Sequence, residues 1–446
     1  MGRAVPASTH EDYSHLDLSE HDPLQKVAES QEPLEPEGRQ SSQSLFTWAL
    51  TLFGTAVGAG ILFLPINAGS FGFWPLLIAT VFIGPLVFFS HRTYSRIVSA
   101  SPTRGLDVLE IVYELTGRKR GLATAVMYWL SIYPTVLIYG VSITNTVDSF
   151  IVNQLHGPQL NRWVLAPLCV GALTAVFVLG RRVVLRIASI LVYPLIIALG
   201  GISLYLIPKW DLESFFHYQS HTPIWLSLLL ILPVLVFSFS HMAAVSQLVL
   251  DMEKSHGAEN EKQVSKVELV TTIMLVVFTM FFVWSCSMAL GADGMDKAAE
   301  ANVPVLTYFA NVTHTPMMAF AAPVIALIAI ATSYYGHMMG TEEGTKYLVR
   351  FFAPEWAERV EGRKFSILIY VAVFVTTSLV AILNPSIMDL ISVVGGLFVA
   401  FLVYILPMLL FQRAKSLRSY ARRPETVIIF LVGLLIMGVT VYNLVH

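Results

Sequence analysis

Long apolar runs separated by short polar clusters make up most of the chain. The stretch from Leu45 to Phe89, for example, contains no Asp, Glu, Lys or Arg. Runs of about 20 apolar residues cross the ~30 Å hydrocarbon layer of a bilayer when they are helical. The pattern predicts eleven such helices, at residues 45–70, 72–94, 121–152, 163–180, 184–207, 223–250, 267–290, 315–340, 365–383, 386–411 and 425–444.

The composition supports an all-α integral membrane protein that lies in a lipid bilayer. Hydrophobic residues make up 55% and charged residues 13% of the 446 positions, and the mean hydropathy is +0.66. A soluble protein would carry about 25% charged residues. The strands of a β-barrel would give shorter, alternating segments, which this sequence lacks. We expect no nucleic-acid partner.

Residues 1–44 differ from the rest of the chain, because they are acidic, rich in Pro, Ser and Gln, and poor in large apolar side chains. This composition predicts a disordered tail. The tail has no basic segment followed by an apolar core, so we expect it to stay cytoplasmic and not to act as a signal peptide. Cys169 and Cys286 lie far apart in apolar runs, which predicts neither a disulfide framework nor a zinc site.

The basic residues indicate an orientation in the membrane. If the tail is cytoplasmic, the loops on its side of the membrane carry 22 of the 28 Lys and Arg residues. The external loops carry only Arg162, Lys209 and Lys297. An excess of Lys and Arg in cytoplasmic loops is the rule for membrane proteins. We therefore expect a cytoplasmic N-terminus and an external C-terminus.

The first span contains the sequence FGTAVGAGILFLP, which is poorly suited to a continuous helix. Gly54, Gly58 and Gly60 give the backbone unusual freedom, and Pro65 follows. We predict that the helix unwinds over residues 57–61. Unwound backbone in a membrane is tolerated where it lines a cavity, and free helix ends suit a zwitterionic ligand. The alternative is that the small residues only allow close helix packing.

The sixth span has a second interruption, with Pro233, Ser238, Ser240 and His241 near its centre. With five spans in each repeat, span 6 is the counterpart of span 1. Interrupted segments at matching positions of two halves indicate the substrate site of a transporter. His241 is compatible with substrate binding, with proton relay, or with a structural hydrogen bond to a neighbouring helix.

The eighth span carries Ala329, Thr332 and Ser333, which share one helical face. Their carbonyl and hydroxyl oxygens suit a small monovalent cation. The alternative is that the hydroxyls only bond to carbonyls of their own helix.

The third span carries a polar stripe on one helical face, spaced by four, three and four residues: Thr135, Tyr139, Ser142 and Thr146. We expect this stripe to face protein or water and not lipid.

Several motifs resemble the hydroxy and aromatic amino acid permease family, and most closely its bacterial serine transporters. They are GTAVGAGILFLPINAG, IYPTVLIYGVSITNTVDSF, LYLIP, FSFSH, GHMMGTEEG and LNPSIMDLI. The resemblance implies a leucine-transporter-type fold with five plus five inverted repeats, broken helices 1 and 6, and one additional helix. We therefore expect repeats at residues 45–207 and 223–411, and an eleventh helix within 425–446.

The resemblance also implies site residues. Those expected to bind substrate are Ala56, Val57, Gly58, Ala59, Gly60, Ile61, Tyr139, Ser142, Ser238, Phe239, Ser240 and His241. Those expected to bind one sodium ion are Gly54, Val57, Ala329, Thr332 and Ser333. Ile61 replaces the asparagine of a second sodium site, so at most one ion is expected.

Two positions depart from the pattern of serine transporters. Thr332 replaces a lysine, which favours sodium over proton coupling, and Ser240 replaces an asparagine, which affects the substrate that is preferred.

We predict a secondary active transporter of the bacterial inner membrane that imports small neutral hydroxylated amino acids, serine first and threonine next. Coupling to sodium or protons drives uptake, and sodium is favoured. One alternative is a proton-coupled or exchange transporter of another neutral or aromatic amino acid. Another is a membrane nutrient sensor that signals through the tail. No cofactor is expected, and HExxH and GxSxG motifs of hydrolases are absent from the sequence. The sequence leaves the oligomeric state open.

Overall fold

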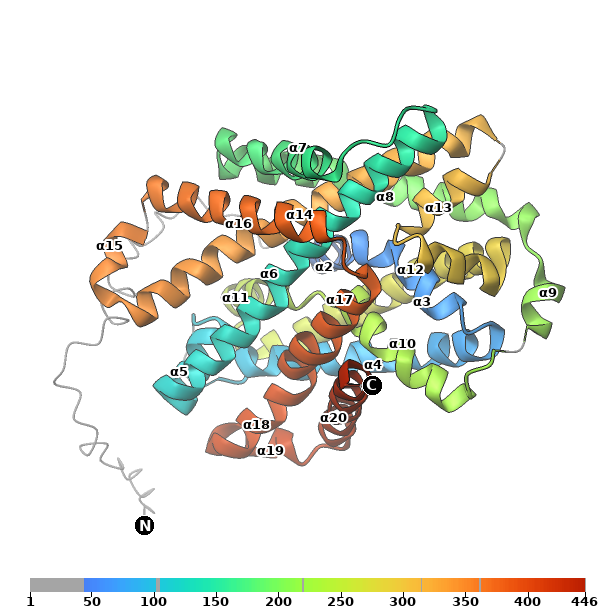
Figure 1. The fold of residues 1–446 in the computed structure, drawn as a ribbon. Coiled ribbons are helices and arrows are strands. Elements are labelled where there is room, and N and C mark those ends of the chain that lie inside the picture. The colour runs from blue at the N-terminus through green and yellow to red at the C-terminus, as the bar shows by residue number, and fades with distance from the viewer. Residues whose placement is uncertain (1–43, 102–104, 219, 314, 361, 446) are drawn as a thin grey trace, which may run out of the picture. The chain divides into compact units, whose positions relative to one another are not determined.

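The computed structural model describes residues 44–101, 105–218, 220–313, 315–360 and 362–445 (Figure 1). Within these ranges every regular element is a helix, as predicted. The predicted disordered tail lies outside the described residues except for Ser44. The Ser44 side chain caps the first described helix, α2 (Leu45–Ala56), by accepting a hydrogen bond from the Thr47 N–H at 3.1 Å.

The described residues contain up to eleven candidate membrane spans, as predicted, when each bent pair is counted as one span. The described residues contain nine helices that are long and apolar enough to cross a membrane, and two bent pairs. The pairs join α2 to η1 (Ala59–Leu62) and α3 (Leu64–Gly69), and α10 (Ile224–Phe239) to α11 (Met242–His256). The nine other spans are built on α4 (Phe73–Ser99), α6 (Arg118–Ser149), α7 (Arg162–Ala175), α8 (Arg181–Leu206), α12 (Asn260–Glu300), α14 (Pro316–Phe352), α16 (Arg363–Leu383), α17 (Ile387–Val393) with α18 (Leu406–Arg413), and α20 (Pro424–Val445).

Several helices continue beyond the apolar runs, so the predicted boundaries of spans 7 and 8 were wrong. Helix α12 begins at Asn260 and α14 continues to Phe352, through segments that we had assigned to loops. The error has a physical cause, because the hydrogen bonds of a helix do not end where the bilayer ends. Helix α12 also bends at Gly291, whose φ of 68° is left-handed.

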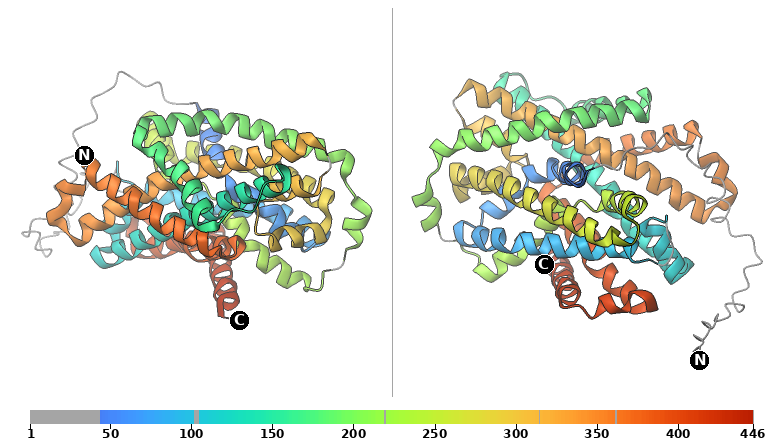
Figure 2. Two further views of the ribbon diagram at one scale, coloured as in Figure 1. Left: turned by 45° about the horizontal axis from the view of Figure 1, so that its top comes forward. Right: turned by 180° about the vertical axis from the view of Figure 1, so that it is seen from behind.

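Helix pairs from distant parts of the chain form the core. Helix α6 packs along α14, and α4 packs along α12. The view from behind in Figure 2 shows α4 and α12 side by side. Two π-helical segments, η7 (Val394–Val399) and η8 (Phe401–Ile405), separate α17 from α18. This packing places α2 and α3 against α12, η1 against α14, and α11 against α12.

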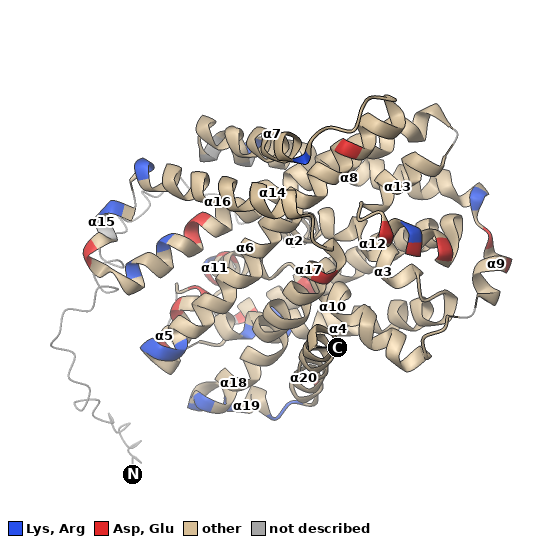
Figure 3. Ribbon diagram, in the orientation of Figure 1, with Lys and Arg blue, Asp and Glu red and all other residues tan. Residues whose placement is uncertain are grey.

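Charged residues gather at the ends of the helices. Figure 3 shows Lys and Arg near α5 (Val108–Thr116), α15 (Ala357–Val360) and α19 (Arg418–Ala421), which lie within loops that we had assigned to the cytoplasm. Arg96 is fully buried and pairs with Glu261 at 3.0 Å and with Glu425 at 3.2 Å. The gathering agrees with the expected asymmetry, and the orientation of the termini stays a prediction.

Candidate functional site

The first helix breaks where its glycines lie. Helix α2 ends at Ala56, Val57 and Gly58 are extended, and a 3₁₀ turn begins at Ala59. The two parts are bent by 55°. The predicted interruption within residues 57–61 is therefore confirmed, although part of that segment forms the 3₁₀ turn.

The second break lies between α10 and α11, which are bent by 47°. Ser240 is extended, with φ −74° and ψ 125°, and α11 begins after His241. Pro233 lies inside α10 and not at the break. The interruption of span 6 is therefore confirmed, and serine and histidine residues occupy it.

The two breaks contact each other. The Ser238 hydroxyl donates a hydrogen bond to the Gly60 carbonyl at 3.1 Å. A Cβ atom at Gly60 would lie 3.0 Å from the Phe237 ring, so this position requires a very small residue. Residues that are 178 positions apart in sequence thus meet between the two interrupted helices.

Ser333 of α14 lies against the first break. Its hydroxyl accepts a hydrogen bond from the Ala59 N–H at 2.8 Å. The Tyr139 ring of α6 packs edge-to-face against His337, one helical turn along α14 from Ser333. A Cβ atom at Gly58 would lie only 2.3 Å from the Ser333 oxygen. The structure therefore brings together predicted residues from spans 1, 3 and 8.

The remaining residues predicted to bind a cation are arranged less compactly. Ala329 and Thr332 are buried, and the Thr332 hydroxyl donates to the Ile328 and Ala329 carbonyls at 3.0 Å. This hydroxyl keeps its oxygen lone pairs for a ligand. Gly54, which was also predicted to bind the cation, packs against α8. A Cβ atom at this position would lie 3.3 Å from the Val192 side chain.

Carbonyl and hydroxyl oxygens dominate this site. Among the described residues, no cluster of three or more His, Cys, Asp or Glu side chains could hold a metal ion. Cys169 and Cys286 are buried free thiols.

The polar stripe on α6 faces the interior of the protein, as predicted. Thr135, Tyr139, Ser142 and Thr146 are at most 3% exposed. Thr146 accepts a hydrogen bond from the Thr307 hydroxyl of α13 (Val305–Val312) at 3.3 Å. In the described part of the chain the buried Ser142 hydroxyl has no hydrogen-bond partner. It therefore remains available to a ligand.

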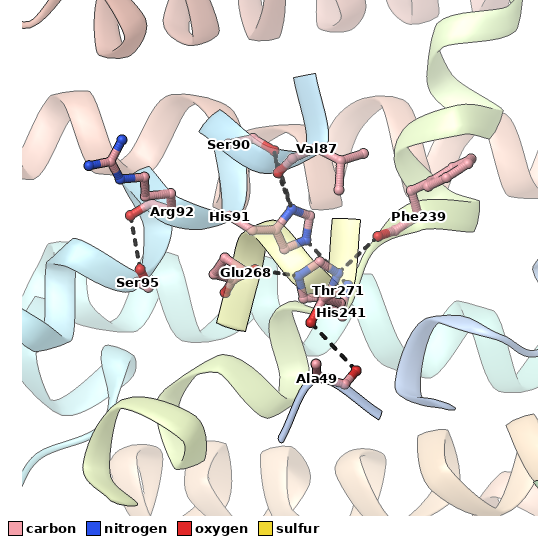
Figure 4. Close-up of polar contacts among 10 residues, drawn as sticks. All are labelled: Ala49, Val87, Ser90, His91, Arg92, Ser95, Phe239, His241, Glu268 and Thr271. Carbon is pink, nitrogen blue, oxygen red and sulfur yellow. Dashed lines mark hydrogen bonds and ion pairs between the residues drawn. The ribbon is translucent and has the colours of Figure 1, made fainter. Parts of the chain in front are cut away.

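The His241 side chain lies between His91 of α4 and Glu268 of α12 (Figure 4). Its Nε2 lies 2.7 Å from Glu268 Oε2, and both side chains are fully buried. Its ring stacks on the His91 ring, with centroids 3.8 Å apart and planes 16° apart. Of the three roles left open for His241, this structure shows a hydrogen bond to a neighbouring helix.

Sequence reasoning did not select His91 or Glu268. His91 lies near the end of the span predicted at 72–94, and Glu268 lies at the start of the span predicted at 267–290. Ionisable residues inside membrane spans are rare and commonly functional. That rule, applied to every span, could have found Glu268.

Comparisons with known proteins agree with this arrangement. A sequence model described as the tryptophan/tyrosine permease family matches residues 41–446. The chain is 35% identical over 403 residues to the serine transporter SdaC of Escherichia coli strain K12, covering 89% of this chain and 94% of that protein. It is 36% identical over 421 residues to the threonine/serine transporter TdcC of Escherichia fergusonii, covering 89% and 95%. The expected family resemblance is thereby confirmed.

Solved structures show the fold. The chain is similar to MhsT in complex with L-phenylalanine, with a TM-score of 0.58 at 13% identity, covering 90% of this chain and 100% of that one. It is also similar to the Eremococcus coleocola manganese transporter, with a TM-score of 0.55 at 14% identity, covering 92% and 88%. The predicted leucine-transporter-type fold is confirmed.

Proposed function

Because the chain belongs to the tryptophan/tyrosine permease family, we propose that it imports small neutral hydroxylated amino acids, serine first and threonine next, across a bacterial inner membrane. A permease moves its substrate without covalent chemistry, so the protein is not an enzyme. Two matched relatives that are named for serine and threonine support this substrate class.

The contact between the two breaks is the observation that carries the proposal. The Ser238 hydroxyl at the end of α10 reaches the Gly60 carbonyl in η1, so the two helix breaks lie next to each other. Discontinuous helices of this kind form the substrate sites of secondary transporters. Peptide N–H groups at the start of one segment suit a carboxylate, and carbonyls at the end of another suit an ammonium group.

In this proposal the residues of the first break hold the main chain of the amino acid. Residues 57–61 bind the carboxylate, and the Ala56 carbonyl binds the ammonium group. Ser238, Phe239 and Ser240 close the opposite side, and Tyr139 and Ser142 contribute polar groups from α6. The unpartnered Ser142 hydroxyl supports this role. We place His241 beside the site and not in contact with substrate, because Glu268 and His91 occupy its ring.

We further propose that sodium accompanies the substrate, bound by Gly54, Val57, Ala329, Thr332 and Ser333. The position of Ser333 against Ala59 supports this assignment, because it joins α14 to the first break. Coupling then requires no direct contact between the two ligands. Each ligand stabilises the same closed arrangement and so raises the affinity for the other.

Transport follows from alternating access. The ligands bind to the interrupted helices, and one group of helices rocks against the other around this site.

Uptake into proteoliposomes tests the proposal. Radiolabelled serine, threonine, alanine, cysteine and tryptophan are compared with sodium and proton gradients applied separately. We expect serine to be taken up fastest, and its uptake to depend on the sodium gradient. Serine uptake below that of tryptophan would overturn the substrate assignment. Serine uptake that is indifferent to sodium would overturn only the assignment of the ion.

A further inference from the structure

The buried contact between His241 and Glu268 requires a proton. His241 Nδ1 lies 3.2 Å from the Phe239 carbonyl, which can only accept a hydrogen bond, so Nδ1 carries a hydrogen. The other ring nitrogen, Nε2, lies 2.7 Å from Glu268 Oε2. An ionised carboxylate facing a bare nitrogen lone pair at this distance would be repelled. One additional proton must therefore lie between Nε2 and Oε2.

Burial places that proton on Glu268. Both side chains are fully buried, and separating charge in such surroundings is costly because neither ion is hydrated. Glu268 Oε1 is also buried and has no hydrogen-bond partner among the described residues. A neutral carboxylic acid tolerates an unpartnered oxygen better than a carboxylate does. In this conformation Glu268 thus donates to the neutral imidazole of His241.

His91 fixes the arrangement from the other side. Its Nδ1 lies 3.1 Å from the Val87 carbonyl, and its Nε2 accepts a hydrogen bond from the His241 backbone N–H at 3.2 Å. In the neutral form of His91, each ring nitrogen therefore has a hydrogen-bond partner. A second proton on His91 would break the bond to His241 and place a charge against the stacked ring.

Few other ionisable groups face this pair. Ser90 contacts His91 Nδ1 at 3.2 Å, and Tyr404 of η8 lies near the Ser90 hydroxyl. Helix α2 also packs against α12 near this pair. Its contact there is uncharged: the Ala49 carbonyl accepts a hydrogen bond from the Thr271 hydroxyl at 3.5 Å.

The charged groups farther along α4 and α11 are engaged elsewhere. Arg96 pairs with Glu261 and Glu425, and Asp251 accepts a hydrogen bond from Trp48 at 2.6 Å. Arg92, one residue after His91, lines a pocket at the surface with Lys262 and Lys266.

We infer that Glu268 and His241 form a proton-binding site that is filled when the second broken helix is closed and emptied when it opens. His241 is the residue before α11, and its Nδ1 bonds to the Phe239 carbonyl at the end of α10. A change in the bend between these helices would break this bond and admit water. The proton then leaves Glu268 Oε2 for water, and the pair keeps one negative charge.

The site is separate from the proposed sodium site on α14, and its link to transport rests on the proposed function. If serine favours the closed arrangement, serine binding and proton binding strengthen each other. The existence of the site does not depend on the identity of the substrate.

Infrared spectroscopy of the purified full-length protein tests the site without any ligand. As pH is raised, we expect the C=O band of one buried carboxylic acid to disappear. The band should be absent from the Glu268→Gln variant, whose amide can donate the same hydrogen bond to His241. It should persist in Glu342→Gln, which changes a buried carboxylate of α14 that binds Lys346 at 2.7 Å. A titrating band that is unchanged in Glu268→Gln, or no titrating band in the native protein, would overturn the inference.

Serine binding tests the link to transport. In weakly buffered solution we expect native protein to take up protons when serine is added, up to one per chain. Its apparent affinity for serine should rise as pH falls, by at most about tenfold per pH unit, the limit for one linked proton. Glu268→Gln should bind serine with an affinity that does not vary with pH, and Glu342→Gln should behave like native protein.

The outcomes separate the two proposals. Failure to bind serine at any pH would contradict the proposed substrate, while the infrared titration still decides the proton site. Serine binding with no proton uptake, or with proton release, would overturn the proposed link. If Glu268→Gln does not fold, proton uptake by the native protein decides that link. The site is then decided by Glu268→Asp, which keeps a carboxylic acid but should shift its C=O band; an unshifted titrating band would overturn the inference.

Discussion

The two broken helices are interrupted by different means. At the first break Gly58 and Gly60 allow close approach of Ser333 and Phe237. At the second break serine residues precede His241, whose ring is held by Glu268 and His91. The first break thus presents bare backbone to a ligand, while the second is anchored by a protonatable pair. Under our two proposals the breaks carry different tasks, ligand binding at the first and control of closure at the second.

The largest expected effect tests the first break. Gly58→Ala places a methyl group 2.3 Å from the Ser333 oxygen. We expect serine uptake to fall by about tenfold or more, since overpacking a tight contact costs ~1–3 kcal/mol. The matched control is Gly336→Ala on α14, where an added Cβ meets nothing within 4 Å. Equal uptake by the two variants in proteoliposomes would show that close approach at Gly58 is unnecessary.

A second prediction concerns the cation proposed to lie between the first break and α14. Thr332→Val keeps the shape of the side chain and removes its hydroxyl. We expect the sodium concentration for half-maximal uptake to rise about tenfold, because losing a bond to a charged group costs ~1.5–3 kcal/mol. Thr55→Val is the control, since its exposed hydroxyl bonds only to the Thr51 carbonyl at 2.8 Å. An unchanged sodium dependence in Thr332→Val would remove this residue from the site.

The contact between the breaks should have a smaller effect. Ser238→Ala removes the hydrogen bond to the Gly60 carbonyl. We expect the KM for serine to rise about fivefold, as one hydrogen bond contributes ~1 kcal/mol. Ser203→Ala, which removes a buried hydroxyl bonded within α8, should leave KM unchanged. A native KM for Ser238→Ala would indicate that the breaks act independently.

The smallest effect is expected where the far ends of the broken helices meet. Trp48 of α2 donates to Asp251 of α11 at 2.6 Å. Asp251→Asn keeps an acceptor but removes its charge, so we expect the uptake rate to fall about twofold or less. Asp293→Asn, at an exposed position on α12, serves as the control. A loss of tenfold or more, measured as initial rate at equal protein amount, would mean that this contact governs the motion of both helices.

The sequence by itself determined the spans, the two breaks and the polar face of α6. These features are local, because apolar length decides whether a helix crosses the membrane and glycine decides where backbone can unwind. Gly58, Gly60, Ser238 and Ser240 were therefore found from short stretches of sequence. The extent of α12 and α14 beyond the apolar runs was missed, since hydropathy does not report where a helix ends in water.

Only the tertiary structure decided which side chains meet. Ser333 bonds to Ala59 across 274 positions, and His241 bonds to Glu268 and His91 across 27 and 150 positions. No periodicity in the sequence encodes these separations, because they depend on how α4, α11, α12 and α14 pack. The proton that Glu268 holds follows from the same packing, since burial and the direction of the Phe239 carbonyl determine which atoms carry hydrogen.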